Sequence, residues 1–237
     1  RLLVRDCRTG DLAFNRADRS LWGVQHHEGK SRLVRFPPPY TRWQEVMVLR
    51  YGKDIFDIDI SPDGQRLTAS LVEISGRQRL IMMSTSSLMS WDPSYDVLWE
   101  FPDNAPANFV FSDDGRHLFG TSYYTGASNV LRYDFDTERM EAVTNCETGF
   151  FRPIPAGSDS LIAFQYTGDG FLPVMIENAT LEDVSAVKYL GHAIAEKHRI
   201  VKEWMLGSPA EVDLDSLTVY RGDYRGITSI RLASAYP

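Results

Sequence analysis

The stretch DIDISPDGQRL, residues 57–67, has the pattern of a short strand that reaches a tight turn and begins again. Ile58 and Ile60 alternate with aspartates, which is the period-two pattern of a strand with one buried face. The Asp-Gly pair at 63–64 then supplies the positive φ that a tight hairpin turn requires. The same pattern returns 51 residues later as NFVFSDDGRHL, residues 108–118. The chain therefore repeats a strand–turn–strand unit.

Two weaker copies extend the repeat to four units. In each unit an apolar residue precedes the turn and a leucine follows seven residues later; the pairs are Phe14 and Leu21, Ile60 and Leu67, Phe111 and Leu118, and Ile154 and Leu161. The first members of these pairs lie 46, 51 and 43 residues apart. The first and fourth turns carry Ala17-Asp18 and Gly157-Ser158 in place of Asp-Gly. Units of this length, each with several short strands, are typical of β-propeller blades.

Each unit contains further strand-like segments. They are residues 31–36 and 45–52 in the first unit, 78–85 and 95–101 in the second, a hairpin over 128–144 that turns at 136–138 in the third, and 171–178 in the fourth, where no outer strand is evident. Residues 2–10 are similar to residues 130–138, so residues 1–10 are predicted to be the tail of an earlier blade. We therefore predict an all-β chain, a β-propeller of about four recognisable four-stranded blades and a partial one, with a short helical C-terminal segment.

The segments ISPDGQRL (60–67) and FSDDGRHL (111–118), with LRYDFDT (131–137) after them, resemble the WD-type β-propeller repeats of TolB-like proteins. The same repeats form the propellers of prolyl-oligopeptidase-like proteins. The resemblance extends over about residues 11–180. It implies a propeller fold, a periplasmic or cell-envelope location in a bacterium, and a protein or a cell-surface component as the binding partner.

The repeat fades after residue 180, so we predict blades over residues 1–180 and a separate segment over 181–237. Apolar residues at helical spacing predict a helix over about 191–205, and the SPAE segment at 208–211 has the pattern of a capping box. This segment is expected to close the propeller or to lead into a following domain. Because the chain begins at Arg1 without a signal segment, we interpret it as a piece of a larger protein.

Composition excludes several classes of function. The chain has 237 residues, a net charge of -7 and no clustered basic residues, which argues against nucleic-acid binding. No apolar run approaches the length of a membrane-spanning helix. The two cysteines, Cys7 and Cys146, lie far apart and predict neither a disulfide framework nor a zinc site. The chain lacks the Gly-x-Ser-x-Gly motif of a hydrolase, a Walker-type loop and a dinucleotide fingerprint, so no catalytic residue is assigned.

Two groups of residues are candidate metal ligands. His26 and Glu28 would share one face of a strand, with His27 opposite, although the spacing is not that of a helical zinc motif; the alternative is a polar hairpin end before Gly29. Asp57 and Asp59 share a face of an innermost strand and could hold Ca²⁺ beside the central channel. The alternative for these aspartates is bonding to the backbone, or to an arginine, of the neighbouring blade.

The sequence favours a non-enzymatic docking module of a larger bacterial envelope protein. The alternative is a substrate-gating propeller of a prolyl-oligopeptidase-like hydrolase whose catalytic domain is not in this chain. Four blades leave the outer faces of the first and last blade uncovered. Apolar side chains on these faces would be exposed to water, which costs free energy. We therefore expect either that residues 181–237 cover the opening or that two chains pair through their open faces.

Overall fold

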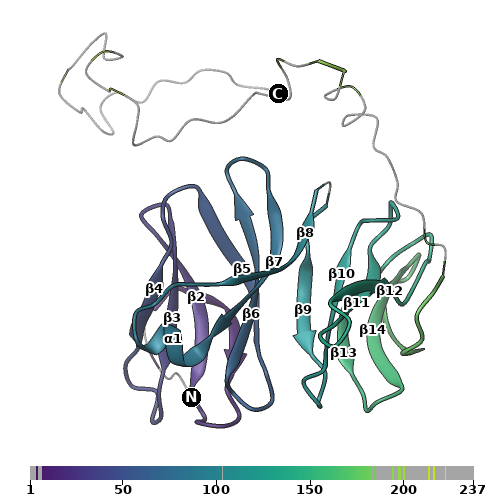
Figure 1. Cartoon of the computed structure of the whole chain (residues 1–237), viewed down its shortest axis with the longest axis horizontal. Helices are drawn as coiled ribbons and strands as arrows, with labels where there is room; N and C mark the ends of the chain where they lie inside the picture. The colour runs from purple at the N-terminus through teal and green to yellow at the C-terminus, as the bar shows by residue number, and fades with distance from the viewer. Residues whose placement is uncertain are drawn as a thin grey trace, which may run out of the picture. The chain divides into compact units, whose positions relative to one another are not determined.

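The computed structural model describes residues 7–102 and 104–182, together with the isolated residues 4, 184, 194, 197, 198, 200, 213, 216 and 222. The chain divides into two compact units, residues 1–206 and 207–237, and the fold described below belongs to the first. Its described residues form four antiparallel sheets that follow one another in chain order (Figure 1). We call each sheet a blade.

The strands of each blade are consecutive in the sequence. Blade 1 contains β1 (Thr9–Phe14), β2 (Leu21–His27), β3 (Lys30–Phe36) and β4 (Gln44–Val48). Blade 2 contains β5 (Lys53–Ile60), β6 (Arg66–Glu73), β7 (Gln78–Ser84) and β8 (Asp96–Phe101), with the short helix α1 (Thr85–Met89) after β7. Blade 3 contains β9 (Ala107–Phe111), β10 (His117–Ser122), β11 (Asn129–Asp134) and β12 (Arg139–Ala142). Blade 4 contains β13 (Phe150–Pro155), β14 (Ser160–Thr167) and β15 (Gly170–Glu177).

The first strand of each blade lies innermost, because β1 contacts β5, β5 contacts β9, and β9 contacts β13. This arrangement of four-stranded meanders around shared inner strands is a β-propeller architecture. The predicted fold class is therefore confirmed. None of the described helices is long and apolar enough to cross a membrane.

The Asp-Gly turns form as their side chains predict. Ser61 Oγ donates to Asp63 Oδ1 at 2.5 Å, the same carboxylate accepts the Gln65 N–H at 3.0 Å, and Gly64 takes a φ of +76°. The Ser112, Asp114 and Gly115 turn of blade 3 repeats these bonds. Short polar side chains that bond to the local backbone hold such turns before any packing takes place.

The fourth turn differs from the prediction by one residue. Pro155, and not Ile154, pairs with Leu161, while Ile154 pairs with Ile162. The turn in blade 4 is therefore one residue shorter than the other three. It lacks the Asp-Gly pair that determines the turn length in blades 2 and 3, so equal spacing was not a safe guide here.

The start of the first blade also needs correction. Thr9 and Gly10 belong to β1, where they pair with Gln25 and Val24, and so are not the tail of an earlier blade. A second difference is α1, which the sequence did not predict. Ser84 caps this helix by accepting the Ser87 N–H, and Leu88 anchors it in the core.

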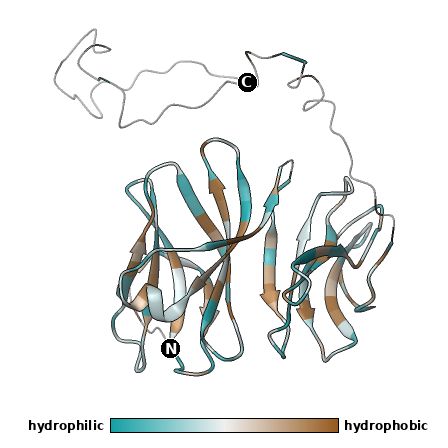
Figure 2. Ribbon diagram, viewed as in Figure 1, coloured by the Kyte–Doolittle hydropathy of each residue, from teal (hydrophilic) through white to brown (hydrophobic). Residues whose placement is uncertain are grey.

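The hydrophobic core lies between successive blades. Three clusters of buried residues occupy the interfaces of blades 1 and 2, blades 2 and 3, and blades 3 and 4. Hydrophobic segments accordingly occur along strands of all four sheets, shown in brown in Figure 2. Each large side chain buried in these layers contributes about 1.5–3 kcal/mol, which makes the interfaces the main source of stability.

The chain turns back towards blade 3 after β15. The Leu181 N–H donates to the Ala142 carbonyl at 2.8 Å, which adds a single bridge to the edge of β12. Most of the predicted helix over 191–205 lies outside the described residues, although Ile194, Lys197 and Ile200 are helical. The predicted capping box at 208–211 also lies outside them.

Candidate functional site

A β-bulge interrupts the inner strand of every blade at the same place. The register of β1, β5, β9 and β13 shifts there, and the first bulge residue takes a left-handed conformation. These residues are Asp11 (φ 43°), Asp57 (φ 51°), Asn108 (φ 54°) and Arg152 (φ 49°), which we call the bulge ring. A non-glycine residue at such a φ is uncommon, and the bulge ring contains four of them at corresponding points.

The bulge ring lines one cavity of about 290 Å³. The apolar part of the lining comes from neighbouring inner-strand residues, which are Leu12, Ile58, Phe109 and Val110. Among the described residues, Asp11 and Arg152 have no ion-pair or side-chain hydrogen-bond partner, and both are exposed. The cavity therefore combines an apolar wall with an unpaired carboxylate from blade 1 and an unpaired guanidinium from blade 4.

Asp57 and Asp59 bond to the backbone of the next blade. Asp57 Oδ2 accepts the Asn108 N–H at 2.9 Å, and Asp59 Oδ2 accepts the Phe111 N–H at 2.8 Å. These bonds are the inter-blade contacts that the sequence offered as the alternative to a calcium site. The two carboxylates take N–H groups three residues apart on β9. The calcium hypothesis for Asp57 and Asp59 stays a prediction.

The surroundings of both aspartates disfavour their charged forms. Burial raises the pKa of Asp57, the Asn108 N–H opposes this, and the Asp11 carboxylate raises the pKa further while Arg152 lowers it. Burial also raises the pKa of Asp59, against the lowering effect of the bond from Phe111. The charge of Asp57 is therefore coupled to the unpaired groups at the two ends of the bulge ring.

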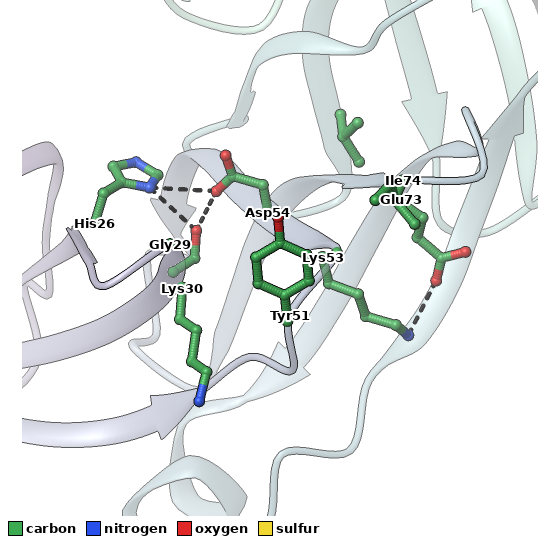
Figure 3. Close-up of a pocket in the computed structure, with 11 residues that line it drawn as sticks. His26, Gly29, Lys30, Tyr51, Lys53, Asp54, Glu73 and Ile74 are labelled. Atoms are coloured by element: carbon green, nitrogen blue, oxygen red, sulfur yellow. Dashed lines mark hydrogen bonds and ion pairs between the residues drawn. The ribbon is translucent and has the colours of Figure 1, made fainter. Parts of the chain in front are cut away.

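A second hollow, of about 340 Å³, lies between blades 1 and 2 (Figure 3). His26 Nδ1 lies 3.5 Å from Asp54 Oδ1 and 3.3 Å from Ser31 Oγ, and Ser31 donates to Asp54. A catalytic triad places the serine and the carboxylate on opposite ring nitrogens, whereas both contact the same nitrogen here. Ser31 is also buried. This group therefore links β2 and β3 to β5, and its geometry does not activate Ser31 as a nucleophile.

The structure gives His26 and Glu28 different partners. His26 faces Asp54, while Glu28 Oε1 lies 3.5 Å from His27 Nε2. Glu28 and Gly29 form the turn between β2 and β3 with φ values of 53° and 71°, which matches the polar hairpin end. Among the described residues, no three His, Cys, Asp or Glu side chains gather closely enough to hold a metal ion.

Blade 4 presents an apolar sheet face that no other described strand covers. Cross-strand partners share a face, and the face of blade 4 turned away from blade 3 carries seven apolar or aromatic residues: Ile154, Ile162, Phe164, Tyr166, Phe171, Pro173 and Met175. We call this set the open face. Met175 is 70% exposed and Phe171 57%. A hollow of about 360 Å³ beside Phe151, Phe164 and Phe171 indents its inner end.

The opposite side of blade 4 is buried at its central strand β14. Leu161 and Ala163 alternate with the open-face residues of β14 and pack against Phe119 and Val130 of blade 3. The sequence predicted open blade faces but did not identify this one, because both sides of β14 are apolar. It also missed the bulge ring, although the bulge residues repeat 46, 51 and 44 residues apart.

The fold is similar to that of known propellers. A putative TolB from Agrobacterium tumefaciens superposes with a TM-score of 0.58 at 19% identity, over 68% of this chain and 56% of that one. A puromycin-hydrolyzing peptidase from Mycobacterium tuberculosis gives 0.54 at 11% identity, over 76% of this chain and 29% of that one. TolB from Acinetobacter baumannii gives 0.52 at 13%, over 75% and 45%.

These similarities confirm the predicted resemblance to TolB-like and peptidase propellers at the level of the fold. The chain spans between about a third and a little over half of the length of these structures. No protein-family model matches the chain, and no curated protein matches it in sequence.

Proposed function

We propose that this chain is a non-enzymatic docking module, a set of propeller blades that binds a second copy of itself through the open face of blade 4. The observation that carries the proposal is the exposure of this face. Exposed apolar patches that are bordered by polar residues mark sites of protein association in soluble proteins. The open face offers aromatic and aliphatic anchors together with a hollow that could receive a side chain from the partner.

The preceding blades indicate what kind of surface fits the open face. The residues that correspond to Ile162 and Phe164 face the next sheet in every earlier blade. They are Trp22 and Val24, Thr68 and Ser70, and Phe119 and Thr121, and all of them are buried. Because a sheet face covers this position three times in succession, a fourth sheet face is the natural occupant. The open face thus continues a series of established interfaces.

A second copy of the chain supplies such a sheet face. Each blade has a forward face, which points towards the next blade in the sequence, and a backward face, which points towards the preceding blade. In each interface the forward face of one blade packs on the backward face of the next. Blade 1 has the backward face that no described blade covers, and Leu12 and Phe14 are about half exposed there. Pairing blade 4 of one copy with blade 1 of the other would join two sets of four blades into eight, which is within the known range for propellers.

The test is the oligomeric state of the full chain, measured by size-exclusion chromatography with light scattering. We expect a dimer at micromolar concentration, and we expect Met175→Glu to convert it to a monomer by placing a charge in the buried interface. The matched control is Met89→Glu, which changes an exposed methionine of α1 and should leave the dimer intact. A wild-type chain that stays monomeric at all concentrations, or a dimeric Met175→Glu variant, would contradict the proposal.

We also propose a location in the bacterial cell envelope, where a docking module would meet envelope partners. The support is the resemblance to TolB-like propellers alone. Fractionation of a bacterium that produces the complete gene product should recover it with envelope or periplasmic proteins. Recovery with cytoplasmic enzymes would contradict this location without affecting the docking proposal.

A further inference from the structure

The bulge ring places opposite charges on blades 1 and 4, and its residues Asn108 and Arg152 also line the hollow beside the open face. Asp11 on blade 1 and Arg152 on blade 4 line the same cavity, and neither forms an ion pair among the described residues, although both act electrostatically on Asp57. Exposed charges often lack partners at a protein surface. Here, however, two opposite charges line one open cavity without forming an ion pair with each other, which leaves room for a ligand between them.

We propose that the bulge-ring cavity binds a small zwitterion, a molecule with an ammonium group and a carboxylate close together, such as a free α-amino acid. The ammonium group lies towards Asp11 and Asp57, and the carboxylate lies towards Arg152. The planar guanidinium of arginine matches a carboxylate with two parallel hydrogen bonds. Carboxylates are the corresponding partners for an ammonium group, which has three donors and no acceptor.

Asp57 has an acceptor available for such a ligand. Asn108 bonds to Oδ2, through its backbone N–H at 2.9 Å and its side chain at 3.4 Å. Among the described residues, Oδ1 of Asp57 has no hydrogen-bond partner. A cationic group beside this oxygen would also offset the burial that disfavours the aspartate charge. One oxygen therefore ties Asp57 to the next blade, and the other remains free for a ligand.

The backbone around the cavity supports a role in binding. Left-handed residues other than glycine are uncommon, although aspartate and asparagine tolerate the conformation best, and Asp11, Asp57 and Arg152 all adopt it around one opening. Unusual backbone conformations concentrate at ligand sites. The volume of about 290 Å³ lies at the lower end of the range for small-molecule pockets, which suits an amino acid better than a larger ligand.

The first experiment measures binding of L-alanine to the full chain by isothermal titration calorimetry. We expect saturable binding, and we expect Asp11→Asn and Arg152→Gln each to weaken it by at least about tenfold through loss of a charged hydrogen bond. Both side chains are exposed, so neither change threatens the core. The matched controls are Asp169→Asn and Arg42→Gln, exposed residues outside the cavity lining, which should bind like the wild type.

The second experiment separates the two halves of the zwitterion. N-acetyl-L-alanine lacks the ammonium group and L-alaninamide lacks the carboxylate, so each should bind at least about tenfold more weakly than L-alanine. Equal binding of L-alanyl-L-alaninamide, which has no carboxylate, and L-alanine would instead identify the amino terminus of a peptide and overturn the zwitterion. Absence of L-alanine binding, or unchanged binding by Asp11→Asn and Arg152→Gln, would also overturn the proposal. Because Met175 lies outside this cavity, the Met175→Glu variant should bind L-alanine normally.

Discussion

The blade 2 surface that faces blade 3 and the open face of blade 4 correspond in position but differ in chemistry at their central strands. Thr68 and Ser70 occupy in blade 2 the positions of Ile162 and Phe164 in blade 4. The two hydroxyls are fully buried and donate to carbonyl groups, and Ser70 reaches Pro106 in the next blade. At these corresponding positions the hydroxyl side chains of blade 2 are buried, whereas the apolar side chains of blade 4 are only half-buried. The rest of the blade 2 surface is apolar and buried, as Leu80 and Phe101 show. What covers a sheet face, and not its composition, determines its burial.

The two surfaces also differ in the contacts that they make or offer to a neighbouring sheet. At the interface of blades 2 and 3, Asp57 and Asp59 bond to the β9 backbone, and Arg66 donates to the Gly115 carbonyl at 2.8 Å. The same guanidinium lies over the Phe135 ring at 4.7 Å. Polar bonds that need a defined geometry specify which blade follows blade 2. The open face has apolar contacts to offer, which favour association without specifying it as closely.

The largest difference between the two surfaces should appear when an aromatic ring is removed. Phe109 is fully buried between blades 2 and 3, where its ring contacts Gly120. Phe109→Ala should lower the free energy of unfolding by about 3–5 kcal/mol, because it removes buried area and leaves a cavity. Urea unfolding followed by circular dichroism measures this change. A loss below about 1 kcal/mol would show that this interface is not part of the cooperative core.

The next largest effect should come from the inter-blade bond of Asp59. Asp59→Ala leaves the Phe111 N–H without its acceptor, which should cost about 1–3 kcal/mol in the same unfolding assay. Asp169→Ala, at an exposed position in the β14–β15 turn, is the control and should change stability by less than about 0.5 kcal/mol. Equal effects of the two variants would show that the hydrogen bond from Phe111 to Asp59 does not stabilise the interface.

A smaller effect should appear in the pH dependence of stability. The pKa of Asp59 is raised in the folded state, so the folded chain holds this proton more tightly than the unfolded chain. The contribution of Asp59 to stability is therefore present at acid pH and falls as the pH rises from about 4, near the unfolded pKa, through the folded pKa. Asn at position 59 cannot titrate. The stability of Asp59→Asn relative to wild type should then increase with pH across this range.

Unfolding free energies of both chains, measured at several pH values between acid and neutral, provide the check. Other carboxylates titrate alike in both chains and cancel in the difference. A difference that is independent of pH would mean that burial does not raise the pKa of Asp59.

The smallest effect on stability is expected at the open face. Phe171→Ala should lower the unfolding free energy of the monomer by no more than about 1 kcal/mol, because the ring is mostly exposed and keeps only its contacts with Phe151 and Tyr166. The same change should weaken dimerisation, which light scattering over a dilution series measures. A large loss of monomer stability would show that another part of the chain already covers Phe171, and that the face is not open.

Several features were predictable from the sequence because they depend on neighbouring residues. Ser61, Asp63 and Gly64 determine their turn with bonds that span five residues or fewer, and the turn has the predicted form. The alternation in β5 and the spacing of the repeat likewise identified the strands and the propeller. In blade 4, where the Asp-Gly pair is absent, the predicted strand pairing was wrong by one residue, because Leu161 pairs with Pro155 and not with Ile154.

The candidate sites were less predictable because their residues meet over long distances in the chain. The sequence singled out His26 and Glu28, but the partner of His26 is Asp54 on the next blade. It also singled out Asp57, while its couplings to Asp11 and Arg152 join residues from three blades. No local pattern records such pairings, since they depend on the angle and order in which the blades pack.

The amino-acid sequence by itself determined the strands, the Asp-Gly turns and the repetition that makes a propeller, because each depends on short-range backbone preferences and on the period of apolar residues. Only the tertiary structure decided which apolar face stays uncovered and which charges surround one cavity. Burial and electrostatic coupling belong to pairs of surfaces, and a surface acquires its neighbour only when the blades have packed.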